Sequence, residues 1–246
     1  MLLEIYDIDY WKNFFDLIHD TSTVIELRLD PEKCSMSLLN NSRICFYTIE
    51  FSKDSFGEYQ IDNSESVLIF VADFYSIIKT ATNKDNIELS TDENMLKIVL
   101  DQHNGNRRVF EIPLAEDYGD SPIPPNVPVN VSFDVLLKDL KQPCLDLDKI
   151  IKTDRFKIIV SDELMEIVSP SDSMTKYNQR IIIDNTGSAT TIVNLGYIND
   201  LQKLNKISNT VTLGLGDNIP LIWNMVSDDG FVKVKGLIAP IIEDID

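Results

Sequence analysis

The residue types that carry out chemistry are present in this sequence, but their spacing supports neither a cofactor site nor a catalytic pair. Gly214-Leu-Gly216 stands at the end of a predicted strand, yet it lacks the third glycine and the following helix of a dinucleotide-binding turn. Asp146, Asp148 and Asp154 lack the glycine and the final glutamate of a calcium-binding loop. Forty acidic residues produce chance pairs, and none stands out as an acid and its base.

Metal and thiol chemistry are equally poorly supported. His19 and His103 have neither a neighbouring Cys nor a second His at ligand spacing. Cys34, Cys45 and Cys144 are odd in number and widely spaced, which predicts buried, reduced thiols rather than disulfides or a zinc site. We therefore expect no enzymatic activity, no cofactor and no metal.

Lysines form the one suggestive pattern, in a chain that should repel nucleic acid. Twenty-two basic residues against 40 acidic ones give a net charge of −18. Yet lysines fall on the polar side of, or just beyond, each of four predicted helices, and on the last two they recur three residues apart. Such a surface suits loose, sequence-independent contact with phosphates, and another device such as enclosure would have to supply persistence. These lysines are Lys12, Lys79, Lys84, Lys138, Lys141, Lys203 and Lys206.

The elements that position these lysines repeat along the chain. A strand, a helix and three strands occur four times in the same order, which predicts an α+β fold. The expected helices span 8–20, 72–82, 133–140 and 195–207, and Pro143 should end or kink the third. The expected strands span 2–6, 23–29, 34–39, 44–51, 67–71, 86–90, 95–101, 107–112, 127–131, 156–160, 164–168, 177–183, 190–193, 210–215, 221–226 and 231–238.

Two domains follow from this repeat. The stretch 113–126 holds four prolines, one glycine and three acids without a base, which is typical of an extended connector. It separates a domain at 1–112 from a second at 127–246. No apolar run reaches the roughly 18 residues that span a bilayer, and the start of the chain does not resemble a signal peptide. We expect an intracellular protein without a membrane partner.

Several motifs resemble the sliding clamps of the PCNA (proliferating cell nuclear antigen) family. The stretch 197–213 and Asn218-Ile-Pro-Leu221 are similar to the last helix and the following strands of these clamps. The ending Leu237-Ile-Ala-Pro-Ile-Ile-Glu-Asp244 resembles the family's "LAP" motif followed by acids, and Phe51-Ser-Lys-Asp-Ser-Phe56 also fits. The resemblance covers the whole chain and is most specific over its last fifty residues.

The resemblance implies a two-domain DNA-clamp fold, with helices on one face and antiparallel sheets on the other. Three chains would form a ring of six domains, in which the lysines of the four helices face encircled duplex DNA. DNA polymerase, other proteins with clamp-binding peptides, and a clamp loader are the implied partners. The location would be cytoplasmic in an archaeon, and nuclear or at a viral replication site otherwise.

The family's binding surfaces carry over by position. The partner-peptide pocket would comprise Leu39, Ile44, Phe46, Ile123, Pro124, Tyr197, Pro220, Leu237, Ile238, Ala239 and Pro240. A head-to-tail subunit interface would pair the strand at 107–112 of one chain with 176–183 of the next. Its expected residues are Arg107, Val109, Phe110, Glu111, Lys176, Tyr177, Gln179 and Ile181.

Some residues depart from the family pattern and leave alternatives open. Asn40 and Arg43 replace a common acid and histidine, Gly196 replaces a basic residue, and Leu237 replaces an aromatic. They indicate a divergent member, archaeal or viral, and put the fine peptide preference in doubt. The alternatives are one subunit of a heterotrimeric clamp, a non-encircling clamp-fold protein such as a viral transcription cofactor, and an unrelated acidic hydrolase.

Overall fold

A computed structural model describes residues 1–102, 104–116, 122–217 and 219–242 of the chain. The chain forms two compact units. Unit 1 comprises Met1–Asn41, Tyr47–Ile123 and Val226–Val234, and unit 2 comprises Ser42–Phe46, Pro124–Met225 and Lys235–Asp246. Strands β4 and β17 therefore each begin in one unit and end in the other. Part of the predicted connector, 117–121, lies outside the described residues, as do His103, Asn218 and the acids from 243 onward.

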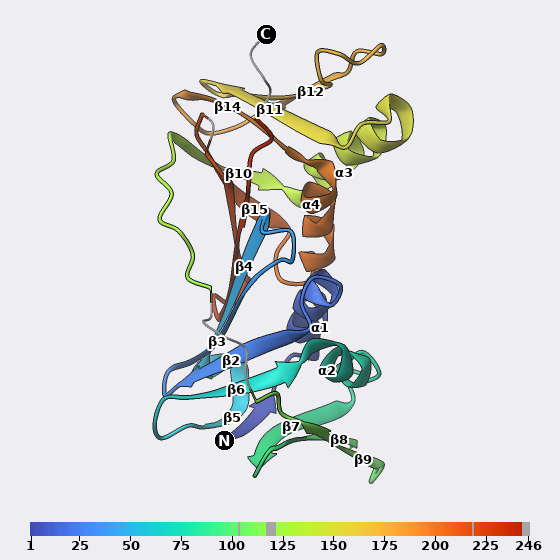
Figure 1. Cartoon of the computed structure of the whole chain (residues 1–246), viewed down its shortest axis with the longest axis vertical. Coiled ribbons are helices and arrows are strands. Elements are labelled where there is room, and N and C mark those ends of the chain that lie inside the picture. The colour runs from blue at the N-terminus through green and yellow to red at the C-terminus, as the bar shows by residue number, and fades with distance from the viewer. Residues whose placement is uncertain (103, 117–121, 218, 243–246) are drawn as a thin grey trace. The chain divides into compact units, whose positions relative to one another are not determined.

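Unit 1 consists of antiparallel strands and two helices that pack against each other, α1 and α2 (Figure 1). One sheet has the strand order β5-β1-β7-β8-β9, and a second run of strands has the order β4-β3-β2-β6. Its elements are β1 (Leu2–Ile5), α1 (Ile8–Ile18), β2 (Val24–Asp30), β3 (Lys33–Leu39), β4 (Cys45–Ser52), the 3-10 turn η1 (Lys53–Ser55), β5 (Phe56–Gln60), β6 (Glu65–Phe70), α2 (Val71–Ile78), β7 (Asp85–Asp92), β8 (Met95–Gln102) and β9 (Arg107–Pro113).

An aromatic core holds the helices of unit 1 in place. Asp7 starts α1 by accepting a hydrogen bond from the Asp9 backbone N–H at 2.8 Å. The Trp11 ring then stacks on Phe51 with 4.7 Å between centroids, and Phe15 lies 4.8 Å from Phe74 of α2. Stacked aromatic pairs add to the free energy gained from burying their surface. The polar side of α1 is thereby fixed away from the core.

Unit 2 repeats the plan with α3 and α4 packed together (Figure 1). One sheet has the order β13-β12-β11-β14, and the other run of strands has the order β10-β15-β16-β17. Its elements are β10 (Val131–Leu136), α3 (Leu137–Asp146), the π-helical turn η2 (Leu147–Ile151), β11 (Arg155–Ser161), β12 (Leu164–Val168), β13 (Asn178–Ile182), β14 (Ser188–Asn194), α4 (Leu195–Asp200), the 3-10 turn η3 (Leu201–Leu204), β15 (Thr210–Leu215), β16 (Leu221–Val226) and β17 (Val232–Ile238).

Three sequence predictions are wrong in detail. The strand expected at 127–131 lies at Val131–Leu136, so Phe133 is a buried strand residue instead of the start of a helix. Helix α3 continues beyond Pro143 to Asp146 and passes into η2, so Pro143 does not end it. The fourth helix ends its α-helical part at Asp200, and η3 follows it. Strand β5 has no counterpart among the expected strands.

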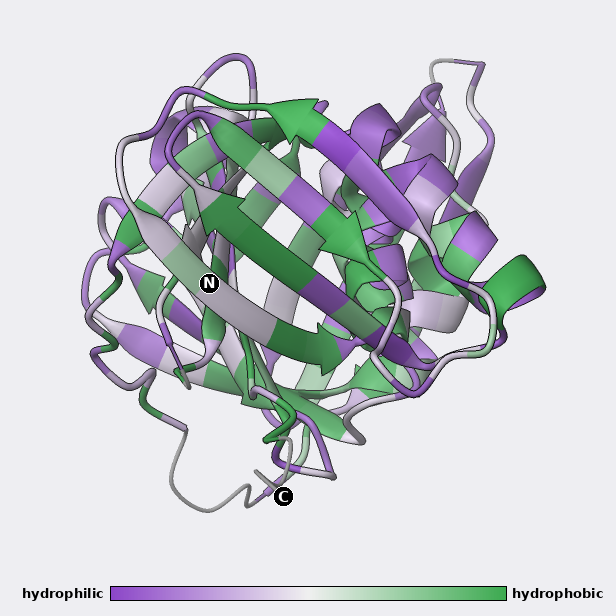
Figure 2. Ribbon diagram, turned by 90° about the horizontal axis from the view of Figure 1, so that it is seen from above, coloured by the Kyte–Doolittle hydropathy of each residue, from purple (hydrophilic) through white to green (hydrophobic). Residues whose placement is uncertain are grey.

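Alternating burial sets which face of each strand meets the core. In β10, residues 131, 133 and 135 are buried and the intervening ones are exposed. Figure 2 shows the matching bands of hydrophobic and hydrophilic residues along the strands. In β17 this packing needs a glycine: a Cβ atom on Gly236 would lie 2.2 Å from Cε2 of Trp223, whose side chain is fully buried.

We expect Gly236→Ala to lower the free energy of unfolding by about 2 kcal/mol, because the buried Trp223 ring has no free space to move into. The midpoint of urea unfolding measures this. Gly57→Ala is the matched control, since its Cβ would meet the flexible Glu4 carboxylate at 3.0 Å. Equal midpoints for the two variants would contradict the steric argument.

Candidate DNA-facing and partner-binding surfaces

The predicted DNA-facing lysines of unit 1 are not equally available. Lys12 is half-buried and donates a hydrogen bond from Nζ to the Ala81 carbonyl at 2.5 Å, so it links α1 to the segment that follows α2. Lys79 is exposed and lies 5.5 Å from the centroid of the Tyr75 ring. Lys84 is exposed in the turn before β7. Lys79 and Lys84 therefore remain the candidates for contact with a phosphate in this unit.

Acidic residues share the polar side of α1 with Lys12. The Tyr75 hydroxyl donates to Asp16 at 2.6 Å, and His19 lies 3.1 Å from Asp20. Burial, followed by the hydrogen bond to Asp16, raises the pKa of Tyr75 to about 12. The helical surface of unit 1 is therefore mixed in charge.

Unit 2 presents its lysines more openly. Lys138 and Lys141 are both exposed on α3, three residues apart. Among the residues that the structure describes, neither takes part in an ion pair. Lys203 of η3 pairs with Asp200 at 3.0 Å, and Lys206 is exposed in the turn after η3. Lys138 and Lys141 are thus accessible candidates for contact with a phosphate, as are Lys79 and Lys84 in unit 1.

Most of the predicted partner pocket belongs to unit 2, where the end of β17 meets the start of β4. The Ala239 N–H donates to the Ile44 carbonyl at 2.8 Å, and the Ile44 side chain is 40% exposed. Ala239 and Pro240 are half-buried, whereas Leu237 and Ile238 are core residues. This leaves an accessible apolar strip of Ile44, Ala239 and Pro240.

The remaining predicted pocket residues differ in exposure. In unit 2, Phe46 is buried, Tyr197 and Pro220 are half-buried, and Pro124 is exposed. Leu39 and Ile123 belong to unit 1, where Leu39 is half-buried and Ile123 is 84% exposed. Exposed apolar side chains of this kind are candidates for covering by a partner.

The predicted subunit-interface strands are both edge strands. Strand β9 stands last in β5-β1-β7-β8-β9, and β13 stands first in β13-β12-β11-β14. Each therefore offers one unpaired row of backbone N–H and C=O groups within its sheet. Arg107, Val109, Phe110 and Glu111 lie on β9, Gln179 and Ile181 lie on β13, and Lys176 and Tyr177 directly precede β13.

Side chains on or beside both edge strands form hydrogen bonds and ion pairs within their own sheets. Arg108 of β9 lies 3.4 Å from the buried carboxylate of Asp85, which also accepts hydrogen bonds from Thr82. Burial alone would raise the pKa of Asp85, but the hydrogen bonds of Thr82, Gln102 and Arg108 outweigh it and lower that pKa. On the other edge, the Tyr177 hydroxyl donates to Gln179 at 2.8 Å. The contact between Arg108 and Asp85 therefore fixes β9 within its own sheet.

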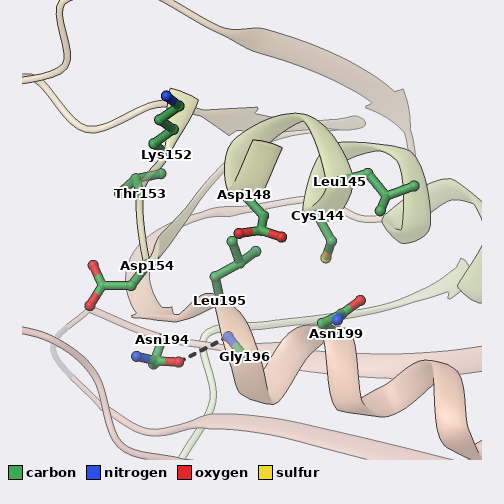
Figure 3. Close-up of a pocket in the computed structure, with 10 residues that line it drawn as sticks. All are labelled: Cys144, Leu145, Asp148, Lys152, Thr153, Asp154, Asn194, Leu195, Gly196 and Asn199. Carbon is green, nitrogen blue, oxygen red and sulfur yellow. Dashed lines mark hydrogen bonds between the residues drawn. The ribbon is translucent and has the colours of Figure 1, made fainter. Parts of the chain in front are cut away.

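A cavity of about 540 Å³ opens between the end of α3 and the start of α4 (Figure 3). Cys144, Leu145 and Asp148 line it from α3 and η2, and Asn194 and Asn199 line it from the other side. Burial raises the pKa of Cys144 to about 12, which keeps the thiol protonated and a poor nucleophile. Lys152, Thr153, Asp154, Leu195 and Gly196 complete the lining of the cavity.

Sequence reasoning did not predict this cavity, because Cys144 and Asn194 are fifty residues apart and share no motif. Within the described residues, no group of three His, Cys, Asp or Glu side chains could hold a metal ion. None of the helices in the described part of the chain is long and apolar enough to cross a membrane.

Comparison with known proteins adds independent findings. Residues 4–116 match the family model described as "Proliferating cell nuclear antigen, N-terminal domain". The chain is 29% identical over 245 residues to the "DNA polymerase sliding clamp" of Methanobrevibacter smithii, and the alignment covers 98% of this chain and 97% of that one.

Solved structures agree over the full length. A chain in the crystal structure of a PCNA2-PCNA3 complex from Sulfolobus tokodaii has a TM-score of 0.87 at 23% identity, with 99% of this chain and 100% of that chain covered. PCNA from Thermococcus kodakaraensis has a TM-score of 0.86 at 18% identity, with 98% and 99% covered. The α+β clamp fold expected from the sequence is confirmed.

Proposed function

Because this chain belongs to the proliferating cell nuclear antigen family, we propose that it is a DNA polymerase sliding clamp. Copies of the chain close into a ring around duplex DNA and hold a polymerase there. The observation that supports this best is the pair of edge strands, β9 in unit 1 and β13 in unit 2.

These two edges suit a head-to-tail interface. Different strands on the two units offer unpaired backbone groups, so β9 of one copy can pair with β13 of the next. Apolar side chains accompany both edges, including Val109 at 48% exposed and Ile182 at 86% exposed. A heterologous contact of this kind builds a ring when its rotation closes.

The −18 net charge fits enclosure better than tight contact. Only a few exposed lysines lie on or next to the helices, so direct affinity for DNA is low and sensitive to salt. A closed ring needs no strong contact to stay on DNA. It needs only enough positive charge on its inner wall to offset the repulsion from its acidic residues.

Light scattering of the purified protein tests the ring. A mass near three times 28.0 kDa is expected if copies of this chain alone close it. A chain that stays at 28.0 kDa at micromolar concentration, with or without related subunits, would overturn the proposal.

One finding favours a second assembly. The Sulfolobus tokodaii structure is of a complex of two different chains, PCNA2 and PCNA3. If this chain is likewise one subunit of a mixed ring, it should be monomeric or dimeric alone and reach the trimer mass only with its partner subunits.

Replacing Lys138, Lys141, Lys203 and Lys206 with Ala should shorten retention on circular DNA and reduce polymerase stimulation, while the ring mass is unchanged. The slope of log affinity against log salt should fall by about 0.9 for each phosphate that a lysine no longer neutralises. The matched control replaces Lys33, Lys53, Lys97 and Lys233, which lie on β3, η1, β8 and β17 and on none of α3, α4 and η3, and removes the same charge. If both variants reduce retention equally, these four lysines do not face DNA.

A further inference from the structure

A second pocket, which we call the aromatic pocket, lies in unit 1 and is separate from the surfaces described above. Three segments build it: the connection from β1 into α1, the η1–β5 segment and the loop before β17. Its volume is about 420 Å³, within the range of roughly 300–1,000 Å³ that is common for ligand sites. No motif marks it in the sequence, because its residues come from positions 6–10, 54–57 and 229–231.

Aromatic side chains form its walls. Tyr6 is 84% exposed and Phe231 is 38% exposed, an unusual exposure for such large rings. Tyr10 and Phe56 also line the pocket. Phe56 is buried and held by the core, with its ring 6.3 Å from Trp11. The pocket thus combines a rigid aromatic floor with exposed aromatic rims.

Carboxylates supply its charge. Asp7, Asp54 and Asp229 line the pocket, and among the described residues no Lys, Arg or His does. In the part of the chain that the structure describes, none of the three takes part in an ion pair. Lys53, which precedes Asp54 in sequence, is paired with Glu32 at 2.6 Å, and its charge also interacts with that of Asp54.

Backbone contacts orient two of these carboxylates. Asp7 accepts from the Asp9 N–H at 2.8 Å, and Asp229 accepts from the Phe231 N–H at 2.9 Å. Burial raises the pKa of Tyr10, and the charges of Asp229, Asp7 and Asp228 raise it further, so these acids act on the same ring. A cationic occupant would complement this charge.

Aromatic faces and carboxylates together recognise guanidinium groups well. The planar, weakly hydrated guanidinium stacks on aromatic rings and hydrogen-bonds to carboxylates at the same time. Nucleic acids carry the wrong charge for this pocket. We propose that the aromatic pocket receives an arginine side chain from a partner protein. This rests on the proposed function in one respect, namely that the chain tethers other proteins.

The test is an NMR titration of the ¹⁵N-labelled full chain with the peptide acetyl-Gly-Ser-Arg-Ser-Gly-amide. Its counterpart carries citrulline, which has nearly the shape of arginine but no charge. We expect the amide signals of Gly57 and Gly230 to shift with the arginine peptide. The citrulline peptide should bind about tenfold more weakly.

Variants distinguish binding in the aromatic pocket from a nonspecific attraction of the peptide to an acidic protein. Tyr6→Ala and Asp54→Asn should each weaken binding several-fold, and neither residue is buried in the core. Asp184→Asn removes the same charge from an exposed site in unit 2 and should leave binding unchanged. Equal binding of both peptides, or an equal weakening in Asp184→Asn, would overturn the assignment. Neither result depends on ring closure, which light scattering tests separately.

Discussion

Phe110→Asp is expected to convert the assembled ring into monomers of 28.0 kDa. Phe110 lies on the edge strand β9, opposite the buried Ile98 of β8, so its half-buried ring faces the core side of the sheet at an open edge. A neighbouring β13 strand would cover that ring. A carboxylate there would lose its water without gaining a partner, at a cost of several kcal/mol at every interface of the ring.

The matched control is Phe231→Asp, which makes the same chemical change at a residue outside both edge strands. It should retain the ring mass. Thermal unfolding followed by circular dichroism should show that both variants remain folded, since neither side chain is fully buried.

Mixing two edge variants sharpens this test. Phe110→Asp damages β9 and leaves β13 intact, whereas Ile181→Asp damages β13 and leaves β9 intact. A head-to-tail interface allows one undamaged contact between the two, so the mixture should form dimers of two times 28.0 kDa while each variant alone stays monomeric. A mixture without dimers would rule out pairing between β9 and β13.

Strands with clear ends and alternating burial could be predicted from the sequence. The bounds of β12, β15 and β16 are those expected, because turn residues such as Asp162 and Pro220 precede the apolar runs. The third helix was harder. Phe133, Leu136, Leu137 and Leu140 fit a helical spacing, but Val131, Phe133 and Val135 also alternate, and the strand pattern is the one that folds.

Strand β5 shows what single-sequence reasoning cannot detect. Only Phe56 is buried in it, so the segment has neither alternation nor a continuous apolar run. Its pairing with β1, for example Leu3 opposite Tyr59, fixes it as a strand. Long-range pairing, not local pattern, determines such an edge element.

The candidate surfaces, too, could be predicted from the sequence only in part. The sequence predicted that lysines recur on or beside four helices, and Lys138 and Lys141 are exposed in the structure. It could not predict that Lys12 is bound to the Ala81 carbonyl, because that contact joins positions 69 residues apart. The aromatic pocket escaped prediction for the same reason. Polar surface patterns are local, whereas the state of each side chain depends on tertiary contacts.

Ile44→Asp is expected to weaken binding of a polymerase C-terminal peptide by about 100-fold or more, which corresponds to about 2.7 kcal/mol. Ile44 is 40% exposed and lies beside Ala239, whose N–H donates to its carbonyl. An apolar anchor of the peptide would have to desolvate the new carboxylate without giving it a partner. Ala239→Asp should have a similar effect from the other side of the same hydrogen bond.

Fluorescence anisotropy of a labelled peptide measures this weakening. Ile44→Leu keeps the apolar contact and should bind within about threefold of the unchanged chain. Val226→Asp places the same carboxylate at another exposed apolar residue, 46% exposed on β16, and should bind normally. The ring mass should not change in any of these variants, because Ile44 and Ala239 lie on neither β9 nor β13. If Ile44→Asp binds the peptide as tightly as the unchanged chain, the partner site does not include the strip formed by Ile44, Ala239 and Pro240. A carboxylate buried there under an apolar side chain of the peptide would have to lower the affinity.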